Sequence, residues 1–206
     1  SRLMDGRRPA ALRSRSVLVL AVVVVGSLAS LTACNPDFAP SRGIECRGGV
    51  IGDSLMLGTQ PSLANELASV GCDLVFFDAA KNRKSLEGIA ALLERDLSGI
   101  DILLVGLGTN DYRWPQHMGP MVDGVMRIAN GTRVVWVGIG GRIDRKLELN
   151  LAILGATTRW ENLWYFDWDA EVTAHPEGMG GDGLHLTRET YPNRSRVIAR
   201  FLGAGS

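Results

Sequence analysis

The sequence predicts one α/β domain built in three layers around a parallel β-sheet, and three observations lead to this. Apolar runs of strand length recur along the chain, helical patterns lie between them, and polar motifs follow the ends of the runs. With 206 residues, of which 46% are hydrophobic, the chain is long enough for one substantial core. Strands that alternate with helices favour right-handed βαβ units and hence a parallel sheet.

The five apolar runs are rich in Val and Ile, which is typical of strands covered on both faces. They span residues 48–53, 73–79, 101–108, 133–141 and 163–169. Four further segments carry helical periodicity, at residues 62–71, 85–97, 145–160 and 188–203. Pro192 delays the start of the last helix. We therefore expect a single domain over residues 48–206.

The N-terminal segment, residues 1–33, has the pattern of an export signal. Four arginines lie between residues 7 and 15, and the apolar stretch Val17–Leu31 is short for a membrane-spanning helix. The following Leu-Thr-Ala-Cys resembles the lipobox of bacterial lipoproteins, which predicts lipidation of Cys34 and attachment to the outer side of the cell membrane. The alternative is an uncleaved anchor with an incidental cysteine. Residues 34–47 are rich in Pro, Ser and Gly and read as a tether.

Without residues 1–33 the chain has 17 basic and 21 acidic side chains. This mildly acidic balance, with no clustered positive run, argues against a nucleic-acid partner. Cys46 and Cys72 each lie just before a predicted strand. If those two strands are parallel neighbours, their starting ends meet and a disulfide becomes possible. The alternative is two separate buried thiols.

Ser54 directly follows the first predicted strand, at the sheet edge where ligands bind in such folds. A serine nucleophile needs a base, usually a histidine that a third group orients. His185 has Asp182 three residues before it, in a loop that approaches the same edge, whereas His117 and His175 have no such partner. The backbone N–H of Ser54, at a helix start, and the side chain of Asn110 could donate to an oxyanion.

Three motifs now resemble the SGNH, or GDSL, hydrolase family: IGDSLMLG (51–58), GLGTND (106–111) and GDGLHLT (181–187). The resemblance implies a flavodoxin-like sheet in the order 2-1-3-4-5. It also implies a serine esterase or acyltransferase with Ser54 as nucleophile, His185 as base, Asp182 as orienting acid and Asn110 as oxyanion donor. Strands one and two are neighbours in this order, which supports the disulfide.

The stretch DAAKNRKSL (78–86) departs from the family pattern. It resembles the Asp-Ala-x-x-Gly-Arg stretch of envelope acyltransferase domains, but Asn82 stands where the family has a glycine whose N–H joins the oxyanion hole. Asparagine tolerates left-handed backbone angles, so we expect its N–H to serve. The likeness favours short acyl esters, for example on cell-wall glycan, as substrates.

Arg83 and Trp114 are candidate substrate contacts. Arg83, with Lys81 and Lys84, suits an anionic substrate or else forms a solvated loop, and Trp114 follows the GLGTND motif closely. No dinucleotide or metal-site pattern occurs, so neither a cofactor nor a metal is expected. We expect a monomer. The competing hypothesis is a non-catalytic binding or scaffolding lipoprotein, which the substitution at residue 82 favours and the complete serine, aspartate and histidine set opposes.

Overall fold

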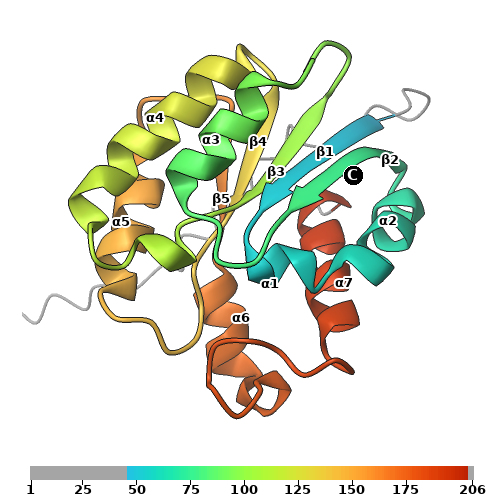
Figure 1. Cartoon of the computed structure of the whole chain (residues 1–206). Helices are drawn as coiled ribbons and strands as arrows, with labels where there is room; N and C mark the ends of the chain where they lie inside the picture. The colour runs from blue at the N-terminus through green and yellow to red at the C-terminus, as the bar shows by residue number, and fades with distance from the viewer. Residues whose placement is uncertain (1–45, 204–206) are drawn as a thin grey trace, which may run out of the picture. The chain divides into compact units, whose positions relative to one another are not determined.

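The computed structural model describes residues 46–203, which form a five-stranded parallel sheet with helices on both faces (Figure 1). The strands are β1 (Cys46–Gly52), β2 (Cys72–Ala79), β3 (Ile102–Gly106), β4 (Arg133–Val137) and β5 (Leu163–Phe166). Their order is β2-β1-β3-β4-β5, which confirms the predicted topology. The predicted signal peptide, Cys34 and the tether up to residue 45 lie outside the described residues. Among residues 46–203 no helix has the length and apolar character needed to span a bilayer.

The described helices include the four predicted from periodicity and the helix start expected at Ser54, together with two that the sequence analysis did not predict. They are α1 (Ser54–Leu57), α2 (Gln60–Ser69), α3 (Ser85–Leu93), α4 (Met118–Ala129), α5 (Lys146–Ala156), α6 (Trp168–Ala174) and α7 (Tyr191–Gly203). The two that were not predicted are α4 and α6. The larger omission is α4, whose Met118, Val122, Val125 and Met126 are all buried on one face. This is ordinary helical spacing, so the signal was present in the sequence.

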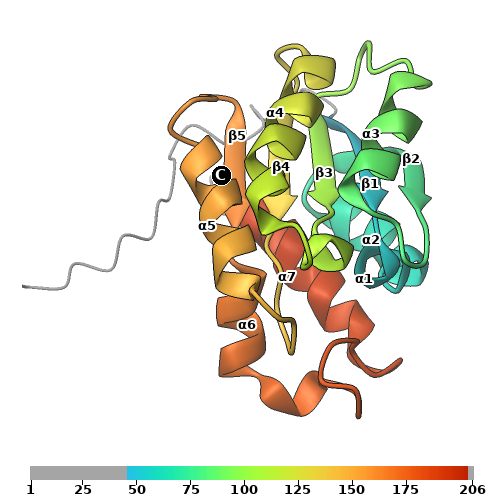
Figure 2. The same cartoon turned by 60° about the vertical axis from the view of Figure 1, so that its left-hand side comes forward.

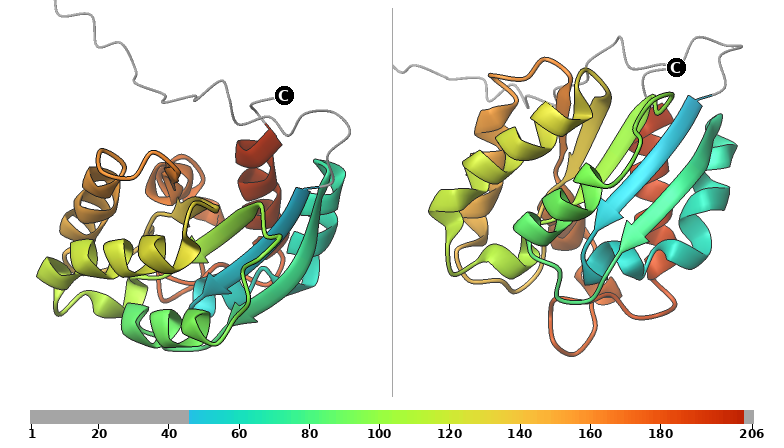
Figure 3. Two further views of the ribbon diagram at one scale, coloured as in Figure 1. Left: turned by 90° about the horizontal axis from the view of Figure 1, so that it is seen from above. Right: turned by 45° about the horizontal axis from the view of Figure 1, so that its top comes forward.

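Two apolar cores lie on opposite faces of the sheet. Helices α3, α4 and α5 cover one face, and α2 and α7 cover the other (Figures 2 and 3). Successive strand residues point to opposite cores, as Leu103 and Leu104 of β3 do. The edge strand β2 is an exception to full coverage, because Val75 remains 46% exposed.

Four of the five strands end earlier than predicted, whereas β2 ends at Ala79 as predicted. β3 ends at Gly106 and β4 at Val137, and the glycine-rich residues that follow leave the sheet. Gly108 has φ 118°, a backbone angle that glycine adopts readily. β5 ends at Phe166, and the Asp167 carboxylate accepts a hydrogen bond from the Ala170 N–H to cap α6. The polar segments at this edge are therefore loops and helix starts.

A disulfide joins Cys46 to Cys72, as predicted. The two residues are register partners at the starts of the parallel strands β1 and β2. β1 begins at Cys46, so the last two residues of the predicted tether, 46–47, belong to the strand instead. The disulfide lies at the opposite end of β1 from Ser54.

Candidate active site

Ser54 is the first residue of α1, directly after the turn that ends β1. The Asp53 N–H donates to the Gly106 carbonyl at 2.9 Å, which ties the turn to the end of β3. Met56 of α1 packs against both strand ends, because a Cβ at Gly52 or Gly106 would lie within 2.3 or 2.1 Å of its side chain. These two glycines therefore let α1 settle on the sheet with Ser54 at its edge.

Asp53 caps α1 and is sealed from solvent, at 1% exposure. Its Oδ1 accepts a hydrogen bond from the Leu55 N–H at 2.9 Å. Burial raises the pKa of Asp53, while hydrogen bonds from Thr109 and from the Leu55 N–H, and the charge of Arg194, act in the opposite direction. An acid this deeply enclosed has no access to a substrate, so we assign it to holding the turn.

Asp182 and His185 lie in a loop that is fixed from several sides. The Gly180 N–H donates to the His185 carbonyl at 2.6 Å, and the Arg142 N–H donates to the Gly183 carbonyl at 2.7 Å. The second bond connects the loop to the segment after β4. The loop therefore carries His185 to the carboxyl edge of the sheet, where β1 delivers Ser54.

Ser54, His185 and Asp182 form a continuous hydrogen-bonded series. The Asp182 carboxylate accepts from the His185 Nδ1–H at 2.8 Å, and Nε2 of the same ring lies 2.9 Å from Ser54 Oγ. Because the carboxylate can only accept, Nδ1 carries the proton, and the lone pair of Nε2 faces the serine hydroxyl. This is the tautomer that a general base for Ser54 requires.

The carboxylate of Asp182 is itself held in its charged form. Its Oδ1 accepts from the Leu184 and His185 N–H groups, both at 2.9 Å. The bond from Leu184, followed by the bonds from His185, lowers the pKa of Asp182 to about 2. Asp182 is consequently ionised throughout the neutral and mildly acidic range.

Asn82 and Asn110 lie in the segments that follow β2 and β3, and of the two only Asn82 lines the space beside Ser54. Asn82 has φ 57°, the left-handed conformation that the family's glycine would adopt easily. The Asn110 side-chain NH₂ donates one hydrogen bond to the Arg83 carbonyl at 3.0 Å. An NH₂ group has two N–H bonds, so a second donor remains on that nitrogen.

An open depression of about 340 Å³ contains Ser54 and His185. Lys81 and Asn82, from the segment after β2, and Tyr191 of α7 are among its lining residues. Its other lining residues are Leu57 and Gly58, and a Cβ at Gly58 would lie 2.0 Å from the Tyr191 ring. The space beside the serine is therefore open to solvent and only partly enclosed.

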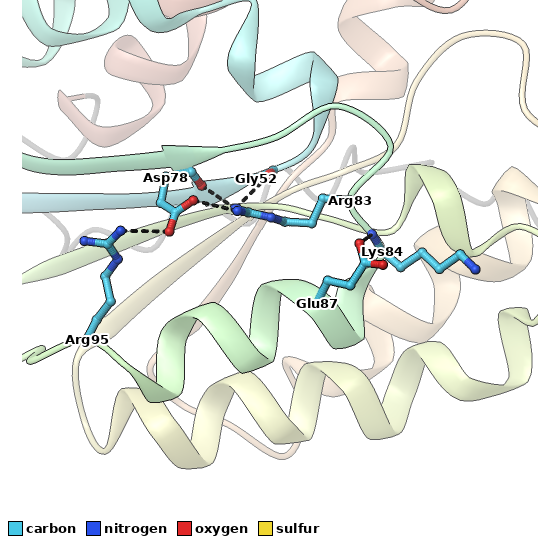
Figure 4. A network of polar contacts seen from close by, with 6 residues as sticks. All are labelled: Gly52, Asp78, Arg83, Lys84, Glu87 and Arg95. Carbon is cyan, nitrogen blue, oxygen red and sulfur yellow. Dashed lines mark hydrogen bonds and ion pairs between the residues drawn. The ribbon is translucent and has the colours of Figure 1, made fainter.

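The two predicted substrate contacts do not join this depression. Trp114 is 58% exposed, and its ring stacks on His117 at 6.2 Å between centroids. The guanidinium of Arg83 turns away to the Asp78 carboxylate and to the Gly52 and Asp78 carbonyls (Figure 4). Arg83 is not among the residues that line the depression, and its guanidinium is engaged within the protein.

The contact between Asp111 and Ser85 was not predicted from the sequence. The Asp111 carboxylate accepts hydrogen bonds from the Ser85 N–H at 3.0 Å and from the Ser85 hydroxyl at 2.7 Å. It thereby caps the start of α3 from the neighbouring loop. The Asn-Asp pair that follows β3 could have suggested a cap, but nothing in the sequence indicates which helix it would cap.

Comparison with solved structures identifies the fold. The C-terminal catalytic domain of peptidoglycan O-acetyltransferase A from Streptococcus pneumoniae matches with a TM-score of 0.61 and 17% identity, covering 79% of this chain and 93% of that one. AlinE4, an SGNH-hydrolase family esterase, matches with a TM-score of 0.55 and 17% identity, over 78% of this chain and 98% of the other. The chain has the SGNH-hydrolase fold.

A third match, a putative acylhydrolase from Bacteroides fragilis, has a TM-score of 0.61 and 14% identity, covering 84% of this chain and 97% of that one. No protein-family model and no curated protein matches the sequence. At these low identities the likeness concerns the fold, so the assignment of an activity rests on the geometry around Ser54.

Proposed function

We propose that this chain is a serine esterase or O-acyltransferase that acts on short acyl esters through an acyl-serine intermediate. The observation that carries the proposal is the series from Ser54 Oγ through His185 to Asp182, with hydrogen bonds of 2.9 and 2.8 Å. Such a series is the arrangement that activates a serine hydroxyl at neutral pH.

In the proposed reaction, Ser54 Oγ attacks the acyl carbonyl while its proton passes to His185 Nε2. The imidazolium that forms is stabilised by the ionised Asp182. The developing oxyanion accepts hydrogen bonds from the Ser54 and Asn82 N–H groups and from the Asn110 side chain. The leaving alcohol takes the proton from Nε2, and an acyl-serine remains. Water or an acceptor hydroxyl then attacks this ester, again with His185 as base.

The activity is tested with the full-length chain and p-nitrophenyl acetate. Ser54→Ala and His185→Ala are each expected to lower kcat by at least about 10³-fold, because each removes a member of the series. His117→Ala is the matched control, since His117 is a solvent-exposed histidine stacked on Trp114 and should leave the rate unchanged. Equal rates in all four proteins would contradict the proposal.

The competing scaffold function predicts a different result with a fluorophosphonate probe, which reacts only with an activated serine. Labelling of the wild type that disappears in Ser54→Ala supports the enzyme. A folded wild type that resists labelling supports the scaffold. The probe needs no acceptor, so it also separates an inactive protein from a transferase tested without its acceptor.

Export and lipid attachment belong to the same proposal. The disulfide between Cys46 and Cys72 fits an oxidising compartment, and the sequence before residue 46 has the pattern of a lipoprotein signal. Metabolic labelling with a fatty-acid analogue tests this directly. Label that is present in the wild type and absent in Cys34→Ala supports anchoring, whereas an unlabelled wild type contradicts it.

The natural substrate proposed is an acyl ester on cell-wall glycan. The fold resemblance to the Streptococcus pneumoniae peptidoglycan O-acetyltransferase domain supports this choice, as does the open depression beside Ser54. Release of acetate from O-acetylated peptidoglycan by the wild type, compared with Ser54→Ala, provides the test. Turnover of p-nitrophenyl acetate without release from glycan would restrict the proposal to another ester.

A further inference from the structure

We propose that Arg83 is a positioning residue that holds the oxyanion-donating loop in place, and that it does not bind the substrate. The loop after β2 carries Asn82, one of the candidate oxyanion donors. Arg83 follows it directly, and its side chain is only 13% exposed. The kinetic test of this inference rests on the proposed function. The structural test rests only on contacts within the protein.

The side chain of Arg83 fastens the loop to the ends of two strands. Its Nη1 donates to the Asp78 carbonyl at 2.8 Å and to the Gly52 carbonyl at 3.3 Å, and its Nη2 donates to the Asp78 carboxylate at 2.6 Å. Figure 4 shows the guanidinium lying between these groups. Gly52 is two residues before Ser54, so this contact links the loop to the strand that delivers the nucleophile.

The backbone of Arg83 provides a third connection. Its carbonyl accepts the hydrogen bond from the Asn110 side-chain NH₂ at 3.0 Å. One residue therefore touches the strand before Ser54, the loop of Asn82 and the side chain of Asn110. The proposed oxyanion donors, the Ser54 N–H, the Asn82 N–H and the Asn110 side chain, belong to these three parts or directly follow them. Arg83 therefore sets the distances between the three donors.

The ion pair between Arg83 and Asp78 is stabilised by a second arginine, Arg95. Burial raises the pKa of Asp78, but hydrogen bonds from Arg95 and Arg83 outweigh it and keep that pKa below its ordinary value. Asp78 Oδ2 accepts from Arg95 at 2.8 Å while Oδ1 accepts from Arg83. A two-armed guanidinium suits this site better than a lysine ammonium, because it reaches several acceptors in fixed directions.

Arg95 supplies the matched control. It is also an arginine paired with Asp78, but it comes from beyond the end of α3 and contacts neither Gly52 nor the loop of Asn82 (Figure 4). Arg83→Met and Arg95→Met each remove one cation from Asp78. Only Arg83→Met removes the side-chain contacts between the oxyanion-donating loop and the ends of β1 and β2, and it keeps the Arg83 carbonyl that accepts from Asn110.

The first arm of the experiment measures backbone hydrogen exchange in the full-length chain. Arg83→Met is expected to exchange at least about tenfold faster than wild type over residues 80–85, since local opening of that segment becomes easier. Arg95→Met should exchange there at the wild-type rate. Equal protection of residues 80–85 in the two variants would overturn the inference, whatever their activities.

The second arm measures turnover of p-nitrophenyl acetate, a neutral ester that offers no charge to bind. Arg83→Met is expected to lower kcat by about 10–100-fold with KM changed less than threefold, because displaced donors weaken transition-state binding. Arg83→Lys should recover part of the loss. A kcat for Arg83→Met equal to that of Arg95→Met would overturn the inference, as would a loss that falls on KM alone.

The two arms keep this inference separate from the proposed function. If the wild type itself does not turn over the ester, the proposed esterase activity fails. Hydrogen exchange over residues 80–85 then decides alone whether Arg83 holds the loop.

Discussion

Removal of the disulfide between Cys46 and Cys72 is expected to destabilise the domain by about 3.5 kcal/mol. The bond closes a loop with a sequence separation of 26 residues, and the loss of chain entropy in the unfolded state gives this value for such a loop. For a domain of this size the loss corresponds to a melting temperature lower by roughly 7–14 °C. The magnitude is a large fraction of the roughly 5–15 kcal/mol that stabilises a typical domain.

The assay is urea unfolding at pH 7, followed by far-UV circular dichroism, for the wild type with and without a reducing agent. Reduction isolates the cross-link, because it leaves both buried sulfur atoms in the core. The double variant Cys46→Ala/Cys72→Ala should lose at least as much stability, since it also leaves cavities. A reduced wild type within about 1 kcal/mol of the oxidised protein would refute the entropic reasoning. Reduction should leave kcat unchanged at temperatures where the protein stays folded, because the bond lies at the far end of β1.

Three other changes give distinct outcomes. Asp182→Asn should lower kcat by about 10³–10⁴-fold, because the His185 tautomer is no longer enforced; an unchanged kcat for p-nitrophenyl acetate would contradict this. The pKa of Asp182 is lowered from 3.8 to about 2, so its ionised form stabilises the fold above pH 3.8 and this contribution is lost as the pH falls towards 2. The free energy of unfolding of the wild type should therefore fall more than that of Asp182→Asn between pH 5 and 2, and acid unfolding of both proteins measures this. Asn82→Gly should keep kcat within about threefold, since glycine adopts the same backbone angle, whereas a tenfold loss would assign a role to the amide side chain. Gly106→Ala should cost about 1–3 kcal/mol in urea unfolding and lower kcat, because the new methyl group displaces Met56 beneath Ser54.

The sheet was predictable because its strands are long apolar runs that the sequence separates clearly. Their order followed from the resemblance and not from the runs themselves, which do not indicate their neighbours. Strand ends were predicted up to four residues too late, as at Val137 of β4. The glycines after that residue are compatible with a strand in sequence, but in the fold they turn the chain towards the loop of His185.

Helix α4 shows a different kind of omission. Its apolar positions have helical spacing, but Pro115, Gly119 and Pro120 lie near its start and suggest a loop instead. Proline is tolerated in the first turn of a helix, where its missing N–H has no intrahelical partner. The local breakers therefore mark the beginning of α4 and do not exclude it.

Some residues of the candidate site could be identified from their neighbours in sequence, whereas the role of Arg83 depends on partners that are adjacent only in the fold. Ser54 follows a strand directly, and Asp182 is three residues from His185, so local position selected each of them as a candidate. The shared sheet edge and the family resemblance joined them into one set. Arg83 also stands next to the site in sequence, and that position suggested a substrate contact. Its actual partners, Gly52 and Asp78, belong to strands that become adjacent only in the folded sheet.

The hydrogen bonds around Arg83 explain how an asparagine can stand at residue 82. The left-handed backbone conformation costs asparagine more free energy than it costs glycine, so contacts around Asn82 must hold its φ of 57°. The hydrogen bonds of Arg83 fix the chain on one side of Asn82, and the Ala80 N–H donates to the Gly52 carbonyl at 3.1 Å on the other. The loop is thus held at both sides of the strained residue. A departure that first favoured a non-catalytic scaffold is therefore compatible with a working oxyanion hole.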